Sequence, residues 1–509
     1  MLLEEDDLEH RPYMFQDCSA LQAAEKYFYD ALTTTDKDEE ADKTDQESCF
    51  FQFNENSGRN KRNDRDPPGE ERSCKQLAGC TAEDPSLQID EYEKSLLCPK
   101  MNPAFYDESP PHYSEESSQS KKNIPVPEVV DLDSLLARCA EAISSFNFAA
   151  GQKLMQQVRQ HCSAYGDANE RLAHCFANAL EARMAGTGSS LYTAFSSRRI
   201  PATEMLKSYQ AYVSACPFKR MSNIFANKSI AKCTGDAKTV HIIDFGIQYG
   251  FQWPCIIHGI SLRPGGPPLL KITGIDFPQQ GFKPGERVEQ TGRRLADFCK
   301  RFNVPFEYNA IAKRWYDVGV EDLKIERDEV LVVNCLYRLG HVPDESAGVN
   351  SPRDAVLKLI RKISPQLFVH GVVNGTYNAS FFTTRFREAM FHYSSLFDML
   401  EATLPREDQD RLLYEREVFG RDVMNVIACE GMERVERPET YKQWQVRIRR
   451  AGFRQVAVNK EIMREVKTKV KKDYHKDFLL DEDGGWMLQG WKGRVMYALS
   501  CWKPTAQDG

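Results

Sequence analysis

The sequence lacks the features that mark secreted and membrane proteins. Its 509 residues contain no apolar stretch that approaches the roughly 18–20 residues needed to span a bilayer. The N-terminus, MLLEEDDLEH, is acidic, whereas a signal peptide needs a basic start and an apolar run. Fifteen cysteines are present, but none forms a CxxC pair, which argues against a zinc site or a disulfide framework. We predict a soluble protein of the cytosol or nucleus with reduced thiols and no membrane contact.

Recognisable catalytic motifs are also missing. There is no GxSxG, no HExxH and no Walker loop, and the ten histidines show no metal-ligand spacing. His241 and His370 lie inside apolar runs, so we expect core histidines with satisfied ring nitrogens rather than bases. We therefore predict no catalytic residue and no metal, although a catalytic set assembled only in three dimensions stays open.

Charge is unevenly distributed along the chain. Residues 1–50 hold 15 Asp and Glu against 4 Lys and Arg, while the rest of the chain carries 63 basic and 59 acidic residues. Residues 1–125 are rich in polar and charged residues and are predicted to be largely disordered. Bulky apolar residues between the acids fit either an activation segment that folds on a partner or a solvated linker. Four basic residues form a weak nuclear localisation patch: Arg59, Lys61, Arg62 and Arg65.

Helical periodicity begins near residue 126. Apolar residues recur at helical spacing from Leu132 to Phe146, with Asp131 or Asp133 as the expected N-cap. Leu132, Leu135 and Leu136 also fit LxxLL, a motif that docks a helix into a partner's groove. Leucines at this spacing are more often core residues, and we favour that interpretation.

From Thr239 onward, strand patterns alternate with helical patterns, which predicts a parallel sheet. The expected strands are 240–243, 269–275, 304–310, 330–334 and 367–373. The expected helices are 253–262, 285–302, 355–363 and 382–400, and residues 494–499 alternate as an antiparallel strand would. The predicted fold is α/β: a Rossmann-like, methyltransferase-type core, mostly parallel with antiparallel edge strands, under an α-helical cap. The cap is expected mainly in 126–235 and the core mainly in 236–509.

The turn after the first strand is the candidate cofactor site. Asp244 ends an apolar run, Gly246 and Gly250 follow, and Asp276 ends the next strand as a possible ribose-binding acid. Gln248 replaces the middle one of the three glycines that a cofactor-binding turn of this type carries. Such a position needs a positive φ, and a residue with a Cβ atom adopts it at a cost on the order of 1 kcal/mol. We therefore predict no cofactor and a vestigial site, with methyltransferase-like or small-ligand binding as the alternative.

Basic clusters are the candidates for DNA contact, because phosphates are bound by such residues. No helix-turn-helix, zinc-finger or basic-zipper signature accompanies them, and a lysine run is usually a solvated face. The candidate residues are Arg198, Arg199, Lys219, Arg220, Lys228, Lys467, Lys469, Lys471 and Lys472.

Several long motifs, in a fixed order from about residue 130 to 503, resemble the plant GRAS family, and more narrowly its lily-type scarecrow-like subgroup. The VHIID motif is present letter for letter as Val240, His241, Ile242, Ile243 and Asp244. Residues 130–186 and 280–312 resemble the two leucine-rich regions of the family. Residues 351–431 resemble its PFYRE region, and residues 452–502 resemble its SAW region. The residues carrying the last two regions are Pro365, Phe391, Tyr393, Arg421, Asp422, Trp486, Trp491 and Trp502.

Two departures from the family pattern are small. Asp422 replaces the family's Glu, and Cys501 replaces the Ala of the closing Ser-Ala-Trp. Members of the subgroup often carry a longer N-terminal segment, so the resemblance suggests a shortened one.

The resemblance implies a plant nuclear transcription regulator rather than an enzyme. The expected partners are other transcription factors and coactivators, with direct DNA contact as a further option and homo- or hetero-dimerisation as a family trait. A pure protein scaffold that never touches DNA is the remaining rival.

Overall fold

The computed structural model describes residues 130–506, except for 199, 280 and 346–350. All of these residues belong to one compact unit, Ser86–Gly509. The predicted activation segment and localisation patch lie outside the described residues. Within the described part, no helix combines the length and apolarity that crossing a membrane requires.

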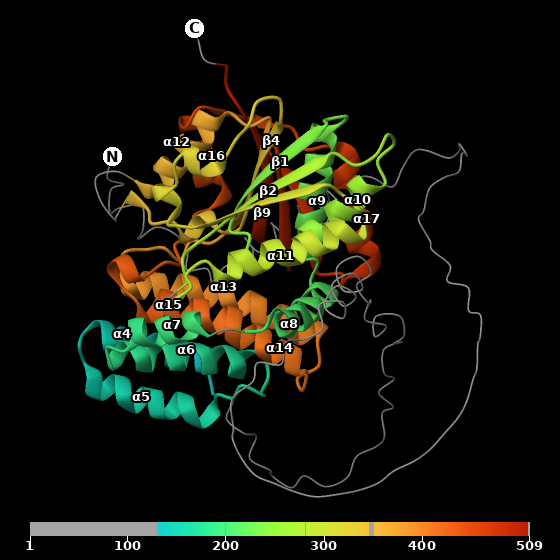
Figure 1. Cartoon of the computed structure of the whole chain (residues 1–509). Coiled ribbons are helices and arrows are strands. Elements are labelled where there is room, and N and C mark those ends of the chain that lie inside the picture. Colours follow the sequence, from blue (N-terminus) through green and yellow to red (C-terminus); the bar gives the residue numbers. More distant parts are fainter. Residues whose placement is uncertain (1–129, 199, 280, 346–350, 507–509) are drawn as a thin grey trace, which may run out of the picture. The chain divides into compact units, whose positions relative to one another are not determined.

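The centre of this unit is a sheet whose first five strands are parallel (Figure 1). They are β1 (Thr239–Phe245), β2 (Leu269–Asp276), β3 (Phe306–Ala312), β4 (Val330–Leu336) and β5 (Leu367–Val373). The spatial order is β3-β2-β1-β4-β5-β9-β8-β7. From β1 the strands run through β2 and β3 toward one edge, and β4 then starts the other half of the sheet, so the strand order reverses between β1 and β4. In such a sheet the ligand crevice lies at the carboxyl ends of the strands where the order reverses.

The remaining strands are antiparallel and extend the sheet beyond β5. They are β6 (Phe453–Val456), β7 (Phe478–Asp483), β8 (Trp486–Trp491) and β9 (Arg494–Pro504). β9 pairs with β5, β8 and β6. The predicted mixed sheet is therefore confirmed, and the predicted strand at 494–499 is the first half of β9.

Helices cover both faces of the sheet, because the strand side chains alternate between two apolar clusters. Val240 and Ile242 of β1 belong to one cluster, and Ile243 and Phe245 belong to the other. The first cluster takes residues from α9 (Pro217–Thr234), α10 (Trp253–Ser261), α11 (Glu286–Arg301) and α17 (Lys460–Asp473). The second takes residues from α12 (Pro352–Ile363) and α16 (Tyr441–Arg450). Four short 3-10 turns span Trp315–Asp317, Glu321–Leu323, Leu339–His341 and Gly431–Glu433.

The helical cap is built from two separate stretches of the chain. The first holds α4 (Leu132–Ser144), α5 (Phe148–His161), α6 (Ala168–Met184), α7 (Gly188–Ser197) and α8 (Ala202–Ala215). The second holds α13 (Phe382–Thr403), α14 (Gln409–Tyr414), a π-helical turn (Glu415–Gly420) and α15 (Arg421–Ala428). α6 packs against both α13 and α15. Residues 382–428, expected in the core region, thus join the cap, whereas α9 contacts β4, β5 and β9 of the sheet.

The first cap helix begins where the sequence predicts. Asp131 is the N-cap of α4, and its Oδ1 accepts a hydrogen bond from the backbone nitrogen of Ser134 at 3.0 Å. Leu132 and Leu136 are buried in the core and Leu135 packs against it. The LxxLL leucines are therefore used inside the fold, and the structure offers no exposed leucine of this motif for docking.

Candidate functional site

Asp244 lies at the carboxyl end of β1, and both of its side-chain oxygens are engaged. Oδ2 accepts a hydrogen bond from Nε1 of Trp253 at 2.8 Å, and Oδ1 accepts one from Nδ2 of Asn334 at 2.9 Å. Burial raises the pKa of the Asp244 carboxyl to about 7, although both hydrogen bonds oppose the shift. This acid therefore ties β1 to α10 and β4, and each of its oxygens already accepts one hydrogen bond within the chain.

Asp276, the acid at the end of β2, is also engaged within the chain. Its Oδ2 accepts hydrogen bonds from Nε and Nη2 of Arg287 at 3.2 and 2.8 Å. Its Oδ1 accepts one from the backbone nitrogen of Phe277 at 2.9 Å. The next ring, Phe277, stacks on Trp315 with centroids 4.8 Å apart. The group that could hold a ribose is thus occupied by an arginine.

The 244–250 turn has the backbone conformation of a glycine-rich turn, and side chains pack closely around Gly246. Gly246, Gln248 and Gly250 have φ of 94°, 47° and 72°, so Gln248 occupies the left-handed region in place of a glycine. A Cβ atom at Gly246 would come within 2.6 Å of Cγ of Arg338. Phe251 stacks beside Tyr249 and packs on Tyr209 of α8, 5.0 Å between centroids. These aromatic side chains thus attach the turn to the cap.

The same sheet edge borders a cavity of about 290 Å³, which lies between the edge and the cap and is lined by the 244–250 turn as well as by residues beyond β4 and β5. The charged side chains that line it include Lys219, Arg338, Arg421, Asp422 and Glu436, and also Arg198, Asp244, Arg287, Glu417 and Glu439. Arg421 and Asp422, the family's Arg-Glu pair in altered form, begin α15, and Nη2 of Arg421 lies 3.3 Å from Oδ1 of Asp422.

The other motif residues mainly build the core. Tyr393 and Pro365 are buried, and the ring of Phe391 lies 3.5 Å below the guanidinium of Arg494. Trp486, Trp491 and Trp502 are buried, and Nε1 of Trp491 donates to Oδ2 of Asp398 at 2.7 Å. These residues hold β8 and β9 against α13, so they are structural parts of the fold.

The two strand histidines differ from each other. His241 is hydrogen-bonded at both ring nitrogens, to Glu329 at 2.7 Å and to Thr273 at 2.8 Å, as predicted. His370 is buried between aromatic rings, and neither nitrogen has a hydrogen-bond partner in the described part of the chain. Burial lowers the pKa of His370 to about 3. The prediction of a satisfied core histidine is therefore wrong for His370, because Trp444 and Phe368 surround it instead of polar groups.

The candidate DNA contacts of the first cluster are mostly paired with acids. Arg198 lies 2.9 Å from Glu417, Arg220 lies 3.7 Å from Asp473, and Lys228 pairs with Glu465. Lys219 lines the cavity, and Arg199 lies outside the described residues. The structure thus does not bring these cations together on one free face.

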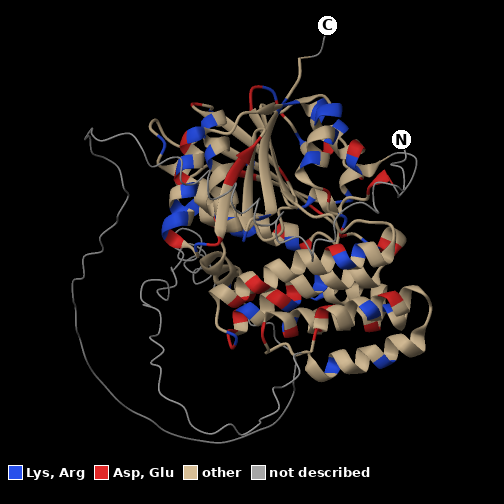
Figure 2. Cartoon of the chain, turned by 180° about the vertical axis from the view of Figure 1, so that it is seen from behind, with Lys and Arg blue, Asp and Glu red and all other residues tan. Residues whose placement is uncertain are grey.

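The lysine run lies on α17, one side of which packs against α9. Lys467 and Lys469 are half-buried, whereas Lys471 and Lys472 are exposed in the last turn. Figure 2 shows Lys and Arg positions along the helices beside the sheet, with Asp and Glu positions interspersed in the cap. Lys471 and Lys472 are therefore exposed and, unlike Arg198 and Lys228, have no ion pair with a described residue.

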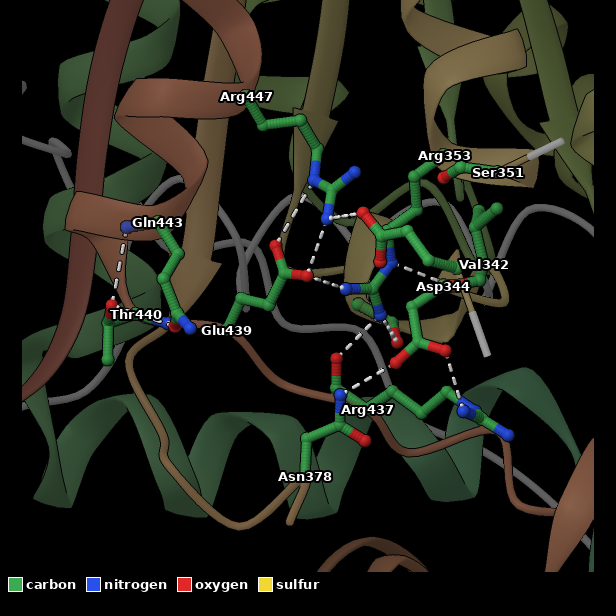
Figure 3. A network of polar contacts seen from close by, with 12 residues as sticks. Val342, Asp344, Ser351, Arg353, Asn378, Arg437, Glu439, Thr440, Gln443 and Arg447 are labelled. Atoms are coloured by element: carbon green, nitrogen blue, oxygen red, sulfur yellow. Dashed lines mark hydrogen bonds and ion pairs between the residues drawn. The ribbon is translucent and has the colours of Figure 1, made fainter. Parts of the chain in front are cut away.

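A buried ionic network, which the sequence does not reveal, joins α12, α16 and the segment before α16 (Figure 3). Arg353 is fully buried, its Nη1 lies 2.7 Å from Glu439, and its Nη2 donates to the backbone oxygen of Arg437 at 2.6 Å. Nη1 of Arg437 in turn lies 2.8 Å from Asp344. Arg447 completes the set at 2.9 Å from Glu439. No local spacing links these residues, so only the folded chain identifies them.

The comparisons with known proteins agree with the motif order. The model of the GRAS domain family matches residues 132–503. Scarecrow-like protein 14 of Arabidopsis thaliana is 52% identical over 455 residues, covering 86% of this chain and 59% of that protein. Scarecrow-like protein 30 of the same plant is 47% identical over 516 residues, covering 99% of this chain and 88% of that protein.

A solved structure is similar as well. The crystal structure of SCL7 from Oryza sativa matches with a TM-score of 0.61 and 28% identity, covering 74% of this chain and all of that one. This chain spans less than two thirds of several relatives, including scarecrow-like protein 14. The match over residues 132–503 and the identities of about half place the chain in the GRAS domain family, whose scarecrow-like members are transcription regulators and not enzymes.

Proposed function

We propose that this protein is a nuclear transcription regulator of the lily-type scarecrow-like subgroup that acts mainly through protein partners. The partners would be other transcription factors and coactivators. Family membership supports regulation, and one structural observation favours partners over direct DNA reading. Three of the predicted phosphate contacts, Arg198, Arg220 and Lys228, already lie next to acids of the same chain.

A tethering experiment tests this proposal. The full chain would be fused to an unrelated DNA-binding domain and assayed on a reporter that carries the matching site. We expect reporter output to differ clearly from that of the DNA-binding domain alone, because recruitment needs no DNA contact by this chain. Unchanged output, or exclusion of a fluorescent full-length fusion from the nucleus, would contradict the proposal.

A second candidate function, direct DNA binding, is favoured by Lys471 and Lys472 at the exposed end of α17. The test is a gel shift of the full chain over a salt series, with Lys471→Glu and Lys472→Glu combined. Direct contact predicts a shallower salt dependence in this variant, by about one unit of slope for each lost phosphate contact. The matched control changes two exposed lysines of α12, Lys358→Glu and Lys362→Glu. An equal change of the salt slope in both variants would reject α17 as the DNA-contacting element.

The rival function is S-adenosylmethionine binding at the 244–250 turn. It is disfavoured because the carboxylates of Asp244 and Asp276 already accept hydrogen bonds from side chains of the same chain. Calorimetric titration with that cofactor tests it, and saturable binding that Asp244→Ala abolishes would revive it. The resemblance also supports a homo- or hetero-dimer, which light scattering of the purified chain would measure.

A further inference from the structure

The cavity beneath the cap contains cations that lack carboxylate partners. Lys219 at the start of α9 forms no ion pair with any described residue, and its Nζ lies 4.2 Å from the ring centre of Tyr337. Arg338, after β4, contacts Nε2 of His341 through Nη1 at 3.2 Å, and its buried Nε has no hydrogen-bond partner among the described residues. Desolvated cations are costly without an anion nearby, so these two groups point to a missing one.

Five of the residues that line the cavity carry carboxylates, but none of them forms an ion pair with Lys219 or Arg338 in the described part of the chain. Burial raises the pKa of both Glu436 and Asp422, which disfavours their ionised forms. Asp422 is paired with Arg421, its neighbour in the chain. Burial and Arg338 lower the pKa of Lys219 to about 8, which leaves that amine mostly charged at pH 7. Lys219 and Arg338 therefore face the cavity without a carboxylate within ion-pair distance among the described residues.

Solvent reaches this cluster from the cavity. The side chains of Arg421 and Asp422 are 28% and 21% exposed, although both lie between the cap and the sheet. Tyr337 adopts φ of 68°, a strained left-handed conformation that is often found at ligand sites. The strained turn places its ring below the Lys219 amine.

Aromatic rings form much of the remaining wall, and two buried histidines line it. The rings are those of Tyr337, Tyr377, Tyr393, Tyr414, Phe419 and Tyr497. His392 and His370 are at most 1% exposed, and Nδ1 of His392 and both nitrogens of His370 lack hydrogen-bond partners in the described part. Unpaired polar atoms and aromatic walls suit a ligand with a flat apolar body and a polar end.

We propose that this cavity binds a small aromatic carboxylic acid, with its carboxylate at Lys219, Arg338 and Arg421 and its apolar body along the tyrosines. The volume of about 290 Å³ lies near the lower end for small-molecule sites, which favours a compact molecule. Because Arg421 belongs to the cap and Arg338 to the sheet edge, the ligand joins the two layers. The 244–250 turn lines the same cavity, but the ligand carboxylate is expected at the cations and not at Asp244, which Trp253 and Asn334 engage. Small-molecule binding here would add to the proposed regulatory function.

Calorimetry on the full chain with a matched pair of probes tests the proposal. 4-Phenylbenzoate carries the carboxylate, and 4-biphenylmethanol has the same rings without the charge. We expect the carboxylate to bind at least about tenfold more tightly, because charge-assisted hydrogen bonds to arginine and lysine require the anion. Arg421→Gln should weaken 4-phenylbenzoate by a similar factor, while Arg293→Gln, on the exposed side of α11, should not change it.

A second variant separates binding from folding. Lys219→Met removes a charge that has no ion-pair partner among the described residues, so its unfolding midpoint should equal or exceed that of the parent. Its affinity for 4-phenylbenzoate should nevertheless fall. Equal binding of the two probes, undiminished binding by Lys219→Met, or no binding of 4-phenylbenzoate at millimolar concentration would each overturn the proposal.

Discussion

The two halves of one sheet edge have opposite characters. At the ends of β1 and β2, Asp244 and Asp276 are fully engaged by side chains and backbone of the same chain. Beyond β4 and β5, Lys219 and Arg338 face a cavity without carboxylate partners. At one sheet edge, acids engaged by the same chain therefore lie beside cations that have no ion pair with a described residue, because different loops carry the two groups.

The strongest test of this contrast replaces one acid in each half. Asp244→Ala leaves Nε1 of buried Trp253 without an acceptor, whereas Nδ2 of Asn334 keeps its hydrogen bond to Oε1 of Gln252, so we expect a loss of about 1–3 kcal/mol in the free energy of unfolding. Asp422→Ala should cost less, because Asp422 and its partner Arg421 both reach solvent. Urea denaturation of both variants measures the difference, and similar losses would remove the distinction between the halves.

A glycine substitution tests how tightly the first half is filled. Gly246→Ala places a Cβ atom 2.6 Å from Cγ of Arg338 at φ of 94°, and we expect a loss of about 1–3 kcal/mol. The control is Gly235→Ala, where φ is 32° and no atom lies within 4 Å of the added Cβ. The loss of stability in Gly235→Ala therefore measures backbone strain without a steric clash. If the thermal midpoints of the two variants coincide, the turn is not sterically filled.

The pH dependence of stability also distinguishes the halves. The pKa of Asp244 rises from 3.8 to about 7 on folding, so its contribution to stability is fully present below pH 4 and is lost as the pH rises toward 7. Asp244→Asn removes this titration. We expect the parent to lose up to about 1.4 kcal/mol per pH unit relative to the variant between pH 4 and 7. Parallel curves from denaturation at several pH values would show that the carboxyl titrates normally.

The smallest effect is expected outside both halves. Lys471→Ala and Lys472→Ala, singly, should each change the free energy of unfolding by no more than about 0.5 kcal/mol, because both side chains are exposed. Chemical denaturation again provides the measurement. A larger loss would mean that the end of α17 has a structural role that its exposure does not indicate.

Local patterns in the sequence were sufficient for much of the sheet. The expected strand 367–373 coincides with β5, and the helix expected at 285–302 differs by one residue at each end from α11. Apolar runs and helical periodicity are properties of neighbouring residues, so they can be recognised without the fold. The strand β3 begins two residues later than expected, at Phe306, which is within the usual uncertainty of a boundary.

The candidate site was harder to predict. Asp244 and Gln248 could be identified from the turn, but the engagement of Asp244 by Trp253 and Asn334 could not, since hydrogen bonding depends on packing. The cavity cluster joins Lys219 to Glu436 across more than half of the described chain. Likewise, the pairing of Lys228 with Glu465 depends on α9 lying beside α17. A single sequence holds no signal for contacts of this range.

The π-helical turn Glu415–Gly420 has a consequence for how the cavity could diversify. It immediately precedes Arg421 and Asp422 in a continuous helical stretch. A π turn accommodates one residue more than an α turn, and one residue corresponds to a rotation of about 100° around the helix. The π turn absorbs that rotation, so deleting its extra residue would leave a regular α turn and keep Arg421 and Asp422 in their present directions. The segment beside the cavity can therefore gain or lose one residue without reorienting the charged pair, so its length and the chemistry of the cavity can change independently.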